Sequence, residues 1–113
     1  LTARAMDCQY IWHAHAARAR QQGISDAFVD ALRDNQPLPS LAGEEQIVVN
    51  YVQELFKTHK TSHATFQATL EQFGALGLTE LTTLMGYYSL LALNANSFEI
   101  DIPAEGSEQR LPI

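Results

Sequence analysis

The stretch that decides the fold is Glu80–Ser97, which reads ELTTLMGYYSLLALNANS. It contains no proline, and its apolar residues recur at helical rather than alternating spacing. One face of the predicted helix carries Leu81, Leu84, Met85, Tyr88, Leu91 and Ala92, and the opposite face carries Tyr87, Leu90 and Leu93. A helix that is apolar all round must be buried all round. We therefore expect part of this surface to meet another subunit.

The rest of the chain also favours helices. Strict alternation of apolar and polar residues occurs only at Phe98–Ile102, which is too short and isolated to build a sheet. We therefore expect an all-α fold, a compact bundle of about five helices. Gly23 is suited to end the first helix, Ser25 to cap the second, and Ser62 to cap the fourth. The expected helices are residues 1–22, 26–34, 40–60, 62–74 and 80–97, followed by an irregular tail over 101–113.

Length and composition limit the class of protein. The chain has 113 residues, 7 Lys and Arg against 13 Asp and Glu, and one Cys. This length predicts a single domain over 1–113, and the Leu start predicts that residues precede it. The net charge of −6 argues against a nucleic-acid partner, and the longest apolar run is too short to cross a membrane. A single Cys cannot form an internal disulfide, so we expect a cytoplasmic protein.

The first expected helix carries a polar seam. At about 100° per residue, Arg4, Cys8, His15 and Arg18 fall within one arc, flanked by Trp12 on one side and Tyr10 on the other. A thiol, an imidazole and two guanidinium groups suit an anionic substrate or acid–base chemistry. The alternative is structural, with the arginines lying along the surface, Cys8 in the core and His15 simply hydrogen-bonded.

Metal and nucleotide sites have little support. His13 and His15 point about 200° apart on a helix, so they cannot meet at one ion. His59 and His63 are four apart, but a helix break at Thr61–Ser62 separates them. The sequence has no glycine-rich phosphate loop. We expect neither metal nor cofactor. A buried tyrosine needs a hydroxyl partner, so Tyr87 or Tyr88 is expected to reach the His15 seam.

Two separated segments resemble the carboxymuconolactone decarboxylase-like family, which includes the alkylhydroperoxidase D-like proteins. The first is Cys8–His15 with the following Gly23–Ser25, and the second is Leu81–Asn96. The closing Leu111–Pro112 is also similar to family members. The resemblance implies an all-helical unit that forms a dimer, trimer or hexamer, with sites at or near subunit contacts.

The two branches of this family imply different chemistry. The peroxidase branch carries Cys-x-x-Cys-x-x-x-His, to which Cys8 and His15 correspond, but Ile11 stands where the second Cys belongs. An antioxidant role would then rest on Cys8 alone and on an outside thiol. The decarboxylase branch implies loss of carbon dioxide from a small carboxylated lactone, and its Tyr, Trp and His correspond to Tyr10, Trp12 and His15.

The primary hypothesis is therefore a decarboxylase-like enzyme acting on a small anionic substrate. The expected catalytic residues are His15, Cys8 and Tyr10, with His15 handling the proton. The expected substrate-binding residues are Arg4, Trp12, Arg18 and Tyr88, with one arginine holding the carboxylate. The alternatives are a peroxidase that uses Cys8 and a non-catalytic oligomeric member of the family. A closed, apolar surround for both Cys8 and His15 would favour the non-catalytic alternative.

Overall fold

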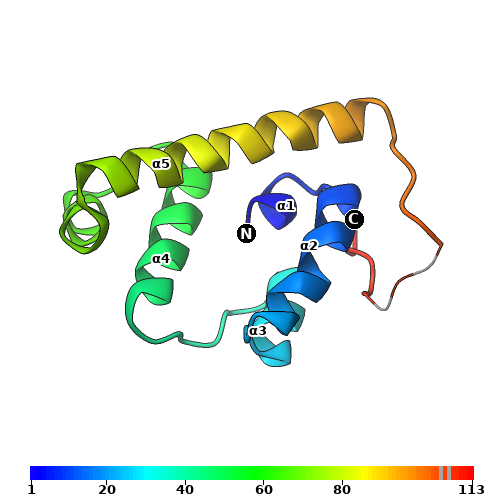
Figure 1. Cartoon of the computed structure of the whole chain (residues 1–113), viewed down its shortest axis with the longest axis horizontal. Helices are drawn as coiled ribbons and strands as arrows, with labels where there is room; N and C mark the ends of the chain where they lie inside the picture. The colour runs from blue at the N-terminus through cyan, green and yellow to red at the C-terminus, as the bar shows by residue number, and fades with distance from the viewer. Residues whose placement is uncertain (105, 107) are drawn as a thin grey trace. The chain divides into compact units, whose positions relative to one another are not determined.

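The computed structural model describes residues 1–104, 106 and 108–113, and these residues form helices and connecting segments without a strand (Figure 1). Helix accounts for 68% of the described residues, which confirms the all-α class. No helix in the described part is long and apolar enough to cross a bilayer. The helices are α1 (Thr2–Ala5), α2 (Gln9–Gln21), α3 (Asp26–Arg33), α4 (Gly43–Thr58) and α5 (His63–Ser97).

The first expected helix is in fact two helices, α1 and α2, so the prediction of one continuous helix over residues 1–22 was wrong. Asp7 has a left-handed φ of 48°, and the N–H of Cys8 donates to the carbonyl of Ala3 at 2.8 Å. The N–H of Asp7 donates to the carbonyl of Arg4 at 3.2 Å, which completes the hydrogen-bond pattern of a helix end. Cys8 then becomes the N-cap of α2.

The turn between α2 and α3 follows the sequence prediction. Gly23 has a φ of 95°, and the N–H of Ile24 returns to the carbonyl of Ala19 at 3.0 Å. The Ser25 hydroxyl accepts a hydrogen bond from the N–H of Phe28 at 3.2 Å. Both expected capping residues therefore perform their predicted roles.

The two helices expected at 62–74 and 80–97 are joined more closely than predicted. Gly74 is not helical, with φ 71° and ψ 175°, so α5 consists of segments 63–73 and 75–97. Gly77 and Thr79, which fall between the two expected helices, lie within the second segment. The Thr79 hydroxyl donates to the Ala75 carbonyl at 2.7 Å, so it satisfies its polar atom without leaving the helix. The expected cap at Ser62 is present, because its hydroxyl accepts from the N–H of Thr65 at 3.2 Å.

Contacts divide the chain into two compact units. The first comprises Leu1 and residues 40–87. Its buried apolar cluster consists of Tyr51, Val52 and Met85, with partly buried apolar side chains around them. The Tyr51 and Thr82 hydroxyls are 2.8 Å apart, so this buried phenol has a partner. Leu84 was expected on a buried face but is 53% exposed. It points away from the small core of α4 and α5.

The second unit comprises residues 2–39 and 88–113, and contains all seven residues predicted for the site. Its core joins α1, α2 and α3 to the last turns of α5 and to the C-terminal segment. The buried members are Ala3, Cys8, Ile11, Trp12, Ala16, Val29, Ala92, Ala95 and Leu111. Leu90 and Leu93 remain 55% and 60% exposed, so one side of these last turns is an apolar surface.

Candidate functional site

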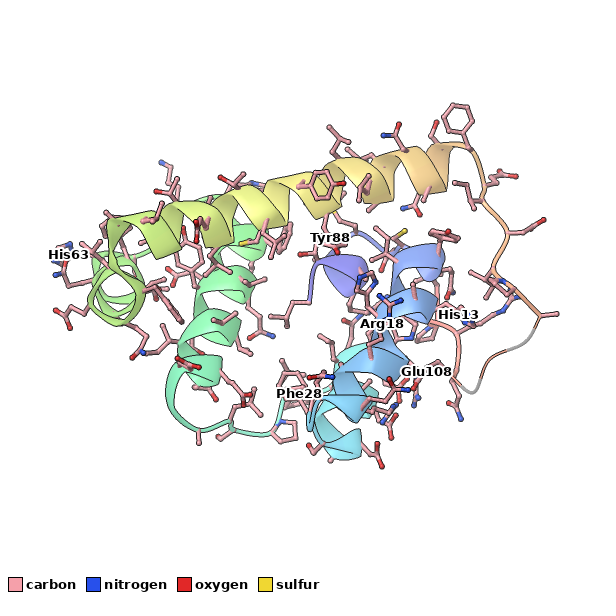
Figure 2. The ribbon with its side chains drawn as sticks, viewed as in Figure 1. His13, Arg18, Phe28, His63, Tyr88 and Glu108 are labelled. Carbon is pink, nitrogen blue, oxygen red and sulfur yellow. The ribbon has the colours of Figure 1, made fainter. Side chains whose placement is uncertain are left out.

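His15 and Tyr88 form the contact that most resembles the expected site. His15 lies in the middle of α2, and Tyr88 lies on α5, where Figure 2 labels it. The Nε2 atom of His15 is 3.3 Å from the Tyr88 hydroxyl oxygen. The two rings meet edge to face, with centroids 5.3 Å apart and an interplanar angle of 87°. The expectation that a tyrosine of α5 reaches His15 is therefore confirmed.

The hydrogen bond at the other ring nitrogen, Nδ1, sets the tautomer of the neutral His15 ring. Nδ1 is 2.9 Å from the carbonyl oxygen of Ile11, one turn earlier on α2. A carbonyl oxygen can only accept, so Nδ1 must carry a hydrogen. In the neutral imidazole, Nε2 then accepts a hydrogen bond from the Tyr88 hydroxyl, and in the imidazolium Nε2 donates one to the Tyr88 oxygen. His15 and Tyr88 are both only partly buried.

Arg18 is a cationic residue on the same helix as His15. It lies three residues after His15, a helical spacing that favours the same face of α2 for both side chains. Arg18 is exposed. No ion pair holds its guanidinium within the described residues. An exposed guanidinium of this kind can bind a carboxylate with two parallel hydrogen bonds.

Arg4, the other expected substrate clamp, has a different environment. Its side chain is 8% exposed, and Nη1 is 2.7 Å from the Asp7 carboxylate. Nε donates to the Asn35 side-chain oxygen at 3.1 Å, which ties α1 to the end of α3. The break at Asp7 also removes Arg4 from the face of α2 that carries His15. The structure therefore gives Arg4 a structural role instead of the predicted place beside His15.

Cys8 lies in the apolar core. It has no exposed surface and belongs to the cluster of Trp12, Ala92 and Leu111. A nucleophilic thiol must be reachable by its substrate, and a buried Cys in apolar surroundings is usually inert. The expected seam of Cys8 and His15 is therefore divided, with the thiol enclosed and the imidazole near solvent.

Trp12 and Tyr10 differ from each other in their surroundings. Trp12 is 4% exposed, and its indole N–H donates to the carbonyl of Gln109 at 3.0 Å. Tyr10 is 44% exposed and lines a hollow of about 330 Å³ together with Asp7, Asn96, Asp101 and Arg110. The seven predicted residues thus fall into the contacting pair of His15 and Tyr88, the exposed Tyr10 and Arg18, and a buried set of Arg4, Cys8 and Trp12.

His59 and His63 lie on either side of the junction between α4 and α5. His59 follows the end of α4 with a left-handed φ of 59°, and His63 begins α5. Within the described residues, no three His, Cys, Asp or Glu side chains are grouped as metal ligands would be.

An ion-pair cluster around Arg20 was not predicted. Its guanidinium contacts the carboxylates of Asp26, Asp30 and Glu108 at 2.8, 2.8 and 2.9 Å. The hydrogen bond from Arg20 holds the pKa of Asp30 below its ordinary value, and the nearby Arg33 adds to this effect. Asp30 and Arg33 are three residues apart, a spacing at which side chains pair on a helix, but Glu108 is 88 residues from Arg20. No local pattern indicates that partner.

No protein-family model, curated protein or solved structure matches this chain.

Proposed function

We propose that the chain is a carboxymuconolactone decarboxylase-like enzyme that acts on a small carboxylated lactone, with His15 as its acid–base residue. The observation that carries this proposal is the hydrogen-bonding of the His15 ring. Nδ1 is bound to the Ile11 carbonyl, which leaves Nε2 beside the Tyr88 hydroxyl on a partly exposed face. This arrangement supports a proton transfer at Nε2.

The proposed reaction needs one cation and one proton donor. Arg18 binds the substrate carboxylate or a neighbouring oxygen of the lactone. The bond between the carboxylate and the ring carbon breaks, carbon dioxide leaves, and the electron pair remains on the substrate as an enolate. Nε2 of the His15 imidazolium then gives its proton to the carbon, and the neutral imidazole takes a proton from water. The Tyr88 oxygen holds the Nε2 proton in place before the transfer.

Two alternatives receive less support. A peroxidase needs a thiol that meets the hydroperoxide, whereas Cys8 has no exposed surface. A member that has lost its site should enclose both Cys8 and His15 in apolar surroundings, but His15 is only partly buried. Acid–base chemistry at His15 is thus the function that the described geometry favours.

We also propose that the active form is a homo-oligomer. Leu90 and Leu93 are more than half exposed on the last turns of α5. No charged residue lies between Leu81 and Phe98, so a second copy that packs against this stretch buries none of its charges. Burying such apolar side chains against another subunit is favourable.

The enzyme proposal is tested by incubating the full chain with carboxymuconolactone and measuring carbon dioxide release. We expect turnover by the wild type, a raised KM with a smaller change in kcat for Arg18→Gln, and unchanged turnover for Arg4→Met. Cys8→Ala should also retain turnover, which separates this reaction from thiol chemistry. A folded wild-type protein that releases no carbon dioxide would overturn the proposal.

A further inference from the structure

The C-terminal residues 108–113 lie along α2 and are bound at three successive places (red in Figure 1). Glu108 makes a two-pronged contact with Arg20, at 2.9 Å to Nε and 3.3 Å to Nη2. The next contact is the hydrogen bond from the Trp12 indole to the Gln109 carbonyl. The last is at Leu111, beside Gln9. The tail therefore runs in the direction opposite to α2.

Gln9 binds the main chain of Leu111 reciprocally. Its side-chain amide donates to the Leu111 carbonyl at 2.7 Å, and its side-chain oxygen accepts from the Leu111 N–H at 3.0 Å. The Gln9 side chain thus satisfies both main-chain polar groups of Leu111, as a neighbouring strand would. Together with Trp12, it binds the tail through main-chain atoms, which are common to all residues except for the N–H that proline lacks.

Two side chains of the tail are bound selectively. The Leu111 side chain is 3% exposed and lies in the apolar cluster, and the Glu108 side chain is 8% exposed against Arg20. Gln109 and Arg110, between them, are exposed. Main-chain hydrogen bonds combined with anchors for spaced side chains are how proteins recognise extended peptides.

We infer that this face of α2 is a binding site for an extended peptide of the pattern Glu-x-x-Leu, and that the chain's own tail occupies it. Arg20 selects the carboxylate, the apolar cluster selects the leucine, and Gln9 and Trp12 hold the backbone between them. The inference does not depend on the proposed decarboxylase activity, because neither His15 nor Arg18 takes part in these contacts.

The test supplies the peptide separately to a full-length chain whose own tail is weakened. A tethered tail has an effective concentration on the order of millimolar, so it outcompetes dilute free peptide in the wild type. The double variant Glu108→Lys, Leu111→Ala places a like charge beside Arg20 and removes the apolar anchor. The probe is the synthetic peptide EQRLPI, which reproduces residues 108–113. The readout is the fluorescence of Trp12, the only tryptophan.

We expect a saturable fluorescence change with this peptide. The peptide KQRAPI should bind about tenfold more weakly or worse, and Gln9→Ala in the double variant should weaken EQRLPI by a similar factor. Equal binding of the two peptides, or no saturable change in a variant that keeps its helical circular dichroism, would overturn the inference.

A second measurement serves if the double variant loses its helices. The wild-type chain is mixed with several millimolar EQRLPI, and the amide signal of Leu111 is followed by NMR. Displacement of the tail should shift that signal towards the position of a solvent-exposed amide, whereas KQRAPI should leave it in place. A Leu111 signal that does not respond to excess EQRLPI would count against a separable peptide site.

Discussion

Replacing Arg4 with Met tests the division between structural and substrate-binding arginines. Methionine keeps the apolar stem but removes the hydrogen bond to Asn35 and the ion pair with Asp7. A hydrogen bond from a charged donor contributes about 1.5–3 kcal/mol. The pair with Asp7 adds about 0–1 kcal/mol, because that carboxylate is 58% exposed and keeps most of its hydration. Asn35 is also exposed and can bind water in the variant, which lowers the total. We expect a loss of about 2 kcal/mol.

The assay is urea unfolding followed by circular dichroism at neutral pH. With a denaturant slope of about 2 kcal/mol per molar, the loss lowers the urea midpoint by about 1 M. Arg18→Met is the matched control, because Arg18 is exposed and its removal should change stability by less than about 0.5 kcal/mol. An Arg4→Met protein with the wild-type midpoint and a raised KM would refute this reasoning and return Arg4 to the substrate site.

Three other predictions concern the backbone, acid stability and assembly. Gly74→Ala should destabilise the chain by about 1–3 kcal/mol, because φ 71° with ψ 175° is nearly restricted to glycine. Gly86→Ala, in a helix with open space around it, should instead stabilise by up to about 1 kcal/mol in the same thermal unfolding assay. Asp30 has a lowered pKa, so its stabilising effect is present above its unfolded pKa of about 3.9 and is lost as pH falls through the folded value. Asp30→Asn should therefore flatten the decline of unfolding free energy below about pH 4, and an unchanged slope would contradict the pairing with Arg20. Leu93→Glu should lower the molar mass measured by light scattering if α5 mediates self-association, and an unchanged mass would argue against this surface.

The sequence predicts the local features of the fold well. The helix end at Gly23 and the caps at Ser25 and Ser62 depend on residues only a few positions apart, and all three are present. The break at Asp7 was missed because it contains neither glycine nor proline. A left-handed Asp is uncommon, and its conformation here is set by the hydrogen bonds that end α1.

The candidate site was predicted only in part, because the break at Asp7 was missed. The proposed seam required one unbroken helix from Arg4 to Arg18, so the break separates Arg4 from His15. The contact of His15 with Tyr88 was expected from the need of a tyrosine hydroxyl for a partner, and it is present. The bonds from Gln9 to Leu111 join residues 102 positions apart, and no spacing rule anticipates them.

The most direct test of the central claim compares the kcat for carbon dioxide release in His15→Gln and His13→Gln. Glutamine retains hydrogen-bonding ability but cannot act as an acid at this position. His13 lies on the same helix, is also partly buried, and makes neither contact of the His15 ring. We predict that His15→Gln lowers kcat by about 10²–10⁴-fold with unchanged circular dichroism, whereas His13→Gln keeps the wild-type kcat. A folded His15→Gln protein with wild-type kcat would contradict the account.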